Sequence, residues 1–175
     1  EFLHALEQSG SVGKGTGWLP LHLSLKDGDE TIAVMPIYLK QHSYGEYVFD
    51  WAWADAYSRY DLDYYPKLVT SIPFTPAHGP RIGTRQPLAT IIPTIRDAIP
   101  QIAAKLDASS WHGLFAPQET IEQFATPEIM PRLGCQYHWF NHDYRDFDHF
   151  LERFNSRKRK NLRKERKKVS DQGVE

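Results

Sequence analysis

The chain has 175 residues, of which 41% are hydrophobic and 13% aromatic, and its formal net charge is −1. This composition excludes a disordered protein, and the length suits one domain, or one domain with the start of another. The single cysteine, Cys135, excludes an internal disulfide, as is usual in a reducing compartment. No apolar run reaches the roughly 20 residues that cross a membrane. We therefore expect a cytoplasmic protein with a packed core.

The positive charge is concentrated in one segment. Residues 157–168 hold nine cations and one anion, a formal +8, whereas residues 1–156 hold 12 cations against 19 anions, a formal −7. A basic segment beside an acidic body favours a polyanionic partner, such as a phosphate-bearing substrate, a nucleic acid or a membrane surface. A solvated helix that packs against the acidic body remains the alternative.

The first 72 residues predict two helices and several short strands. The expected elements are the end of a helix at 2–6, a glycine-rich loop at 9–17, strands at 21–25, 31–40 and 47–49, a helix from Ala52 and a strand at 66–72. Leucines that alternate with polar residues predict the first strand. Asp27-Gly28-Asp29 predicts a hairpin turn after it, and Pro36 indicates an edge or a bulge in the returning strand.

The remainder of the chain predicts alternating helices and strands, which indicates the mixed α/β class. The expected elements are a proline-rich loop at 73–83, a helix at 85–107, a strand at 112–116, a helix at 119–124, a strand at 134–141, and helices at 146–154 and 156–171. Prolines inside the helix at 85–107 predict a kink or a break. Asn155 or Ser156 suits the N-cap of the last helix.

The motifs of several common sites are absent from the sequence. Gly13-Lys14-Gly15 has neither the spacing nor the hydroxyl of a Walker phosphate-binding loop. His138 and His142 fall on a predicted strand and the loop after it, where a spacing of four residues does not converge on a metal ion. We therefore expect a flexible loop at the glycines and no metal site.

Three segments together resemble a known family. They are residues 42–57, which include SYGEYVFDWAWADAY, residues 64–79, which include YYPKLV and PFTP, and residues 138–168, which include RKNLRKE. They are similar to the FemAB-like peptidoglycan biosynthesis/recognition group, which is related to GNAT N-acyltransferases, and the resemblance covers nearly the whole chain. It implies a GNAT-like fold with a central mixed sheet flanked by helices. It also implies two domains in tandem: the first at 1–155, and at 156–175 the basic helix that opens the second.

The resemblance implies N-acyl or aminoacyl transfer to an amine acceptor, such as a nucleotide-linked cell-wall precursor. Fem-type enzymes take an amino acid from aminoacyl-tRNA, and other GNAT proteins use acyl-CoA. The acyl-CoA pyrophosphate loop [QR]xxGx[GA] is not found, since the nearest string, at 81–85, has the wrong spacing. The donor, acyl-CoA or aminoacyl-tRNA, therefore stays open. A non-catalytic recognition module on a degenerate GNAT-like fold also stays open.

Two carboxylates are the candidate catalytic residues. Acyl transfer to an amine needs a proton acceptor, a stabilised oxyanion and aligned substrates. On a strand, Glu46 and Asp50 would share a face, and a carboxylate beside Trp51 and Trp53 would have a raised pKa. The alternatives are that Asp50 caps the following helix and that Glu46 forms an ion pair with a lysine or arginine.

Two further groups of residues are candidates for binding. The substrate-binding candidates are Trp53, Asp55, Tyr65, Lys67, Thr75 and Arg81, and the phosphate-binding candidates are Arg157, Arg159, Lys160, Arg163 and Lys164. Lys67 and Arg81 would hold a phosphate or carboxylate, the second of them from a proline-rigid loop. The aromatic residues would line a sugar or peptide groove, or else belong to the core.

Overall fold

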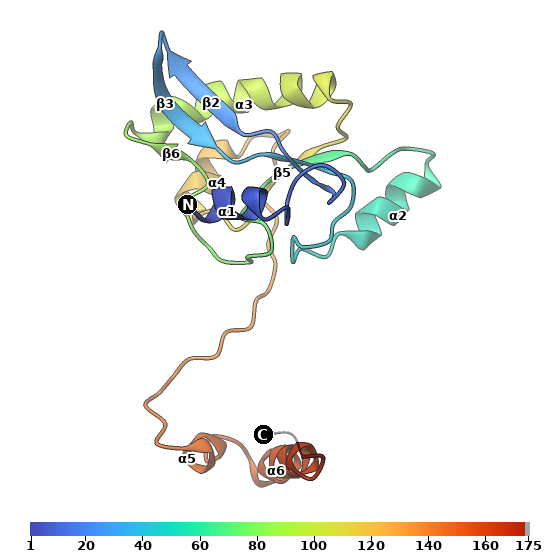
Figure 1. Cartoon of the computed structure of the whole chain (residues 1–175), viewed down its shortest axis with the longest axis vertical. Helices are drawn as coiled ribbons and strands as arrows, with labels where there is room; N and C mark the ends of the chain where they lie inside the picture. Colours follow the sequence, from blue (N-terminus) through green and yellow to red (C-terminus); the bar gives the residue numbers. More distant parts are fainter. Residues whose placement is uncertain (174–175) are drawn as a thin grey trace. The chain divides into compact units, whose positions relative to one another are not determined.

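The computed structural model describes residues 1–173, and the chain divides into two compact units, Glu1–Gly134 and Cys135–Glu175 (Figure 1). We call them unit 1 and unit 2. Unit 1 contains every strand of the described residues, and unit 2 contains the last two helices. The assignment of a first domain to 1–155 and of an opening helix to 156–175 stays a prediction.

Unit 1 is built on two sheets. The first, in the order β1-β4-β5-β7, consists of β1 (Trp18–Pro20), β4 (Tyr38–Lys40), β5 (Lys67–Thr70) and β7 (Trp111–Gly113). It is mixed, because β5 pairs antiparallel with β4 and parallel with β7. The second sheet is antiparallel, in the order β2-β3-β6, with β2 (Leu23–Asp27), β3 (Glu30–Met35) and β6 (Gly83–Thr84). The mixed α/β class is confirmed.

The predicted hairpin is confirmed, but its second strand is divided. β2 and β3 pair across a turn in which Gly28 has a φ of +58°, a backbone conformation that glycine adopts without strain. We expected one strand at 31–40, and this is wrong, because β3 ends at Met35 and β4 begins at Tyr38 in the other sheet. Pro36 lies at the division, where its missing N–H costs no ladder hydrogen bond.

Four helices complete unit 1 close to their predicted positions. They are α1 (Phe2–Gln8), α2 (Trp51–Arg59), α3 (Leu88–Lys105) and α4 (Gln118–Phe124). α3 buries four isoleucines in a core cluster that it shares with Ala33 and Met35 of β3. We expected a kink or a break in this helix, and a break does not occur, because α3 continues through Pro93 and Pro100, which lie on its exposed side. There, water can satisfy the carbonyls that the prolines leave unpaired.

Two predicted strands do not form. Tyr47 has a φ of +57°, in the left-handed region, which is incompatible with the strand expected at 47–49. Residues 134–141 have no regular secondary structure, and no described strand pairs with them. In both segments the aromatic residues matched strand propensity, but propensity forms a strand only where a neighbouring strand supplies the hydrogen bonds.

Unit 2 contains α5 (Phe147–Leu151) and α6 (Ser156–Ser170), as predicted. Asn155 caps α6, because its Oδ1 accepts a hydrogen bond from the backbone N–H of Lys158 at 2.9 Å. The two helices contact each other through an ion pair between Arg163 and Asp148 at 2.8 Å. Within residues 1–173, no helix is both long enough and apolar enough to cross a membrane.

Candidate functional site

A buried ion cluster in unit 1 brings together three of the predicted site residues. Lys67 is the first residue of β5, and its Nζ donates hydrogen bonds to Glu46 Oε2 at 2.9 Å, Asp50 Oδ2 at 2.5 Å and Ser43 Oγ at 2.9 Å. The three acceptors lie between β4 and α2, in a segment without strand or helix. We call these four residues the Lys67 cluster. Both predicted catalytic carboxylates therefore meet at one lysine.

Asp50 occupies the N-cap position of α2, as one of the two alternatives for it predicted. Its side chain, however, makes no capping hydrogen bond. The carboxylate instead accepts from Lys67 and, at 2.7 Å, from the hydroxyl of Tyr64. The Asp50 carboxylate therefore pairs with Lys67 instead of capping α2. An unpaired buried ammonium group costs far more free energy than an uncapped N–H that is exposed to water.

A second buried lysine adjoins the cluster. Lys40 of β4 donates from Nζ to the carbonyl of Tyr44 at 3.0 Å and lies 3.5 Å from the centroid of the Trp18 ring. The indole N–H of Trp18 donates to the same carbonyl at 3.1 Å. Sequence reasoning missed Lys40. The sequence signal for a buried lysine was its position at the end of an otherwise apolar strand. A lysine at a strand end is usually exposed, so this signal was not decisive.

Tyrosines close the cluster on another side. The hydroxyl of Tyr65, a predicted substrate-binding residue, lies 2.8 Å from Ser43 Oγ. The rings of Tyr64 and Tyr65 lie 5.2 Å and 5.7 Å from Lys67 Nζ, within the range of cation–π attraction. Tyr65 is therefore part of the support around Lys67.

The pKa values of the two carboxylates in the cluster are shifted in opposite directions. Burial raises the pKa of Glu46 above its ordinary value, and the nearby Lys67 offsets only part of that effect. Burial also acts on Asp50, but hydrogen bonds from Lys67, Ser43 and Tyr64 outweigh it and hold the pKa of Asp50 below its ordinary value. We expected a raised pKa for Asp50, and this is wrong. Glu46 is the carboxylate whose pKa moves toward that of a general base.

Burial shifts the pKa of two basic groups near the cluster as well. It lowers the pKa of Lys40 to about 7, with Glu46 opposing and Lys67 adding to the effect. It lowers the pKa of His112 on β7 to about 4, and Lys67 contributes in the same direction. Lys40 therefore titrates near neutral pH, and the ring of His112 stays neutral there.

The Lys67 cluster is closed to solvent. Lys67 and Asp50 are 0% exposed and Glu46 is 2% exposed. Glu46 Oε1 and Asp50 Oδ1 are buried, and within the part of the chain that the structure describes they have no hydrogen-bond partner. In this arrangement the carboxylates anchor the backbone that carries them, and a substrate reaches them only if that backbone moves.

The anchored segment presents aromatic side chains to solvent. The exposed fractions are 67% for Tyr44, 55% for Tyr47, 81% for Phe49, and 47% for both Trp51 and Trp53. We call residues 44–53 the aromatic segment. So many exposed rings in one short segment are typical of an interaction surface, because each exposes apolar area to water. Trp53, a predicted substrate-binding residue, lies here, and the guanidinium carbon of Arg132 is 5.1 Å from the centre of its ring.

Packing fixes the start of the aromatic segment. Gly45 has a φ of +80°, and a Cβ at this position would lie 2.7 Å from ring carbons of Phe74. The carbonyl of Gly45 also accepts a hydrogen bond from the backbone N–H of Phe74 at 3.1 Å. Only glycine fits here, so packing against Phe74 fixes this part of the aromatic segment.

Three other predicted substrate-binding residues make their contacts away from the cluster. Asp55 pairs with Arg59 one turn along α2, and Thr75 donates to the carbonyl of Pro73 at 3.1 Å. The guanidinium of Arg81 is buried and donates to four backbone carbonyls, those of Ala77, Gly79, Pro80 and Leu114. These contacts give Arg81 a structural role in its loop, and anion binding by it stays a prediction.

The predicted phosphate-binding residues all lie on α6 of unit 2. Four of them are exposed, namely Arg157, Lys160, Arg163 and Lys164, and Arg159 is half-buried. Arg163 is also engaged with Asp148. Throughout residues 1–173, no three His, Cys, Asp or Glu side chains lie together in a way that could hold a metal ion.

Comparison with known proteins adds one match. The model of the FemAB-like family, described as peptidoglycan biosynthesis/recognition, matches residues 1–175, the whole chain. No curated protein and no solved structure matches the chain. The family predicted from the three sequence segments is confirmed.

Proposed function

The chain belongs to the FemAB-like family of peptidoglycan biosynthesis or recognition, and we propose that it serves N-acyl or aminoacyl transfer to an amine of a cell-wall precursor. In this proposal unit 1 binds the acceptor, and the donor is acyl-CoA or aminoacyl-tRNA. The protein works in the cytoplasm, where both donors are made. The fold is GNAT-related, in keeping with the mixed sheet of unit 1.

The observation that carries the proposal is an exposed aromatic segment on an anchored backbone. Sugar rings and peptide side chains both stack on exposed aromatic rings, and a cell-wall precursor contains both kinds of group. Trp51 and Trp53 are therefore the main acceptor contacts. Lys67 holds the backbone before α2 while the acceptor is absent, so the two rings are presented on one segment.

Glu46 is the proposed proton acceptor. The attacking amine must lose a proton as its nitrogen bonds to the acyl carbon, and a carboxylate with a raised pKa is suited to take that proton. Its Oε1 is the oxygen without a hydrogen-bond partner among the described residues. Because Glu46 is buried, the proposal requires that the aromatic segment moves when the acceptor binds.

One observation favours a second function. The Lys67 cluster is closed, with Asp50 fully buried and paired with Lys67 and Tyr64, which is the arrangement expected of a structural support. A recognition module would use the same aromatic segment to bind a cell-wall ligand without any chemistry.

A transfer assay separates the two functions. The protein would be incubated with a nucleotide-linked muramyl peptide and, in parallel, with acetyl-CoA or aminoacyl-tRNA, and the peptide would be followed by mass spectrometry. Addition of an acyl or aminoacyl group to the amine supports the transferase. Saturable binding of the muramyl peptide without addition from either donor contradicts it and supports the recognition module.

A further inference from the structure

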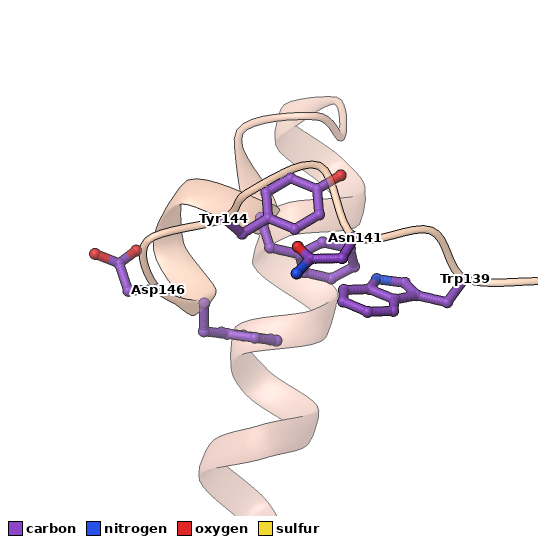
Figure 2. Close-up of a pocket in the computed structure, with 6 residues that line it drawn as sticks. Trp139, Asn141, Tyr144 and Asp146 are labelled. Carbon is purple, nitrogen blue, oxygen red and sulfur yellow. The ribbon is translucent and has the colours of Figure 1, made fainter.

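Unit 2 contains a hollow that neither the family assignment nor the proposed transfer uses. Its volume is about 440 Å³, and it is lined by Trp139, Asn141, Tyr144, Asp146, Phe147 and Phe150. Figure 2 shows Trp139 and Asp146 on opposite sides of the hollow, with Tyr144 and Asn141 between them. It is an open hollow on the surface rather than an enclosed cavity. We call it the Trp139 hollow.

The wall opposite Trp139 is held by packed rings. The ring of Phe150 lies 5.3 Å from that of Tyr144 and 5.8 Å from that of Phe147. The guanidinium of Arg166 on α6 lies 4.2 Å from the centre of the Phe147 ring, and Arg153 donates to the Tyr144 hydroxyl at 3.1 Å. These contacts fix the wall before any ligand binds, which lowers the entropic cost of binding.

Trp139 itself has free surface for a ligand. Its ring lies 6.1 Å from that of Tyr144, and the side chain is 65% exposed. A planar ring placed on the exposed indole would bury apolar area and gain stacking energy. The Trp139 hollow therefore suits a flat ring in particular.

One polar side chain at the hollow can recognise the edge of such a ring. Figure 2 shows Asn141 between Trp139 and Tyr144, and its amide offers both donors and an acceptor. The carboxylate of Asp146 points away from Trp139 and accepts from the backbone N–H of His149 at 2.7 Å, so it caps α5. An amide matches the mixed donors and acceptors along the edge of a nucleobase.

The charge of unit 2 favours a ligand with several phosphates. α6 carries nine cations and one anion between Arg157 and Lys168, and these 12 residues extend over about 18 Å. A single diphosphate would occupy two or three of these cations. Cations distributed over this length of helix are matched instead by consecutive phosphates of a nucleic-acid strand.

We propose that unit 2 binds single-stranded nucleic acid, with one base stacked on Trp139 in the hollow and the neighbouring phosphates on α6. Proteins that bind single strands combine a stacking surface with a basic surface in this way. A glycan would also stack on Trp139, but it would leave the cations of α6 without partners, so the charge decides for nucleic acid. Aminoacyl-tRNA, one of the two donors proposed above, would be one such ligand, but the binding of a single strand requires no acyl transfer.

The test compares two aromatic variants of the chain in a binding assay. Fluorescence anisotropy would follow a labelled RNA of about 12 nucleotides that cannot pair with itself. We expect Trp139→Ala to weaken binding by about 10-fold, as loss of one stacked base does. Tyr137→Ala is the matched control, because Tyr137 is 96% exposed and does not line the hollow. We expect it to change the affinity less than about 2-fold, and circular dichroism would verify that both variants keep their helices.

Heparin, a polyanion without bases, separates stacking from charge. Trp139→Ala should leave heparin binding unchanged, whereas the double variant Arg157→Ala/Lys160→Ala should weaken both RNA and heparin and flatten the dependence of affinity on salt. The proposal is overturned if RNA does not bind at low salt, or if the two aromatic variants behave alike. It is also overturned if a chitooligosaccharide binds in place of RNA and loses its affinity in Trp139→Ala.

Discussion

Lys40 and Lys67 lie directly opposite each other in the antiparallel pairing of β4 with β5, and both side chains are fully buried. Two ammonium groups in adjacent strands repel each other. Glu46 and Asp50 compensate, because both carboxylates lie close enough to favour the charged form of Lys40, and both pair with Lys67. The ion pairs of Lys67 thus attach the segment before α2 to the sheet, and they fix the backbone that carries the aromatic side chains.

Removing the positive charge of Lys67 should destabilise the protein strongly. In Lys67→Met the carboxylates of Glu46 and Asp50 stay buried without their main partner, and we expect a loss of about 3–5 kcal/mol in the free energy of unfolding. Urea denaturation measures it. Lys105→Met, at the exposed end of α3, is the control and should change stability by less than about 0.5 kcal/mol. A similar small change in Lys67→Met would refute the anchoring role of the cluster.

Lys40 should make stability rise with pH above neutrality. Its pKa is lowered to about 7 in the folded state, whereas an unfolded lysine keeps a pKa of about 10.4. Between these values the unfolded chain binds one more proton, so stability should increase by up to about 1.4 kcal/mol per pH unit from pH 7 to 9. The Lys40→Met variant should lose this slope. An identical slope in both proteins would show that Lys40 stays charged when buried.

His112 should act in a separate pH range. Burial, with a contribution from Lys67, lowers its pKa to about 4, and the unfolded value is about 6.5. The unfolded chain therefore binds the extra proton between pH 4 and 6.5, and the contribution of His112 to stability should be lost as the pH falls through this range. The His112→Gln variant should show a weaker acid dependence than the unmodified protein. An equal or stronger dependence would exclude a buried neutral imidazole.

Changing Glu46 should separate transfer from binding. The Glu46→Gln variant keeps an oxygen that can accept from Lys67 but cannot take a proton from the amine. We expect the rate of acyl transfer to fall by about 100-fold or more, with acceptor affinity changed less than about 2-fold. Glu128→Gln, an exposed carboxylate of unit 1, serves as the control. Full activity of Glu46→Gln would assign the proton transfer to another group.

Local patterns were sufficient to predict most elements of unit 1 and both helices of unit 2. The alternating leucines before Gly28 and the capping Asn155 are signals that act over a few residues, and the structure contains the elements they predicted. The predicted strand at 47–49 does not form, because contacts with residues distant in sequence determine its backbone conformation. Its backbone is set by the hydrogen bonds from Lys67 to Glu46 and Asp50. These bonds join residues more than 15 positions apart, and no local pattern encodes them.

The candidate site was predictable in part. The family-like segment identified Glu46 and Asp50 as its carboxylates, and Lys67 was identified as the first residue of a predicted strand. Their pairing, and the opposite pKa shifts of the two carboxylates, depend on burial and on hydrogen bonds that exist only in the folded chain. Lys40 was missed because one lysine at the end of a strand is ordinary, and its significance comes from the strand register that places it opposite Lys67.

The most direct test of the account is the binding of a nucleotide-linked muramyl peptide, measured by calorimetry, to the protein and to its Trp53→Ala variant. Trp53 is half exposed on the aromatic segment, so its removal should leave the fold intact. We predict that Trp53→Ala weakens binding by about 10-fold or more, while Phe2→Ala, which removes an exposed ring from α1, has no effect. Equal affinity of all three proteins would contradict acceptor binding by the aromatic segment.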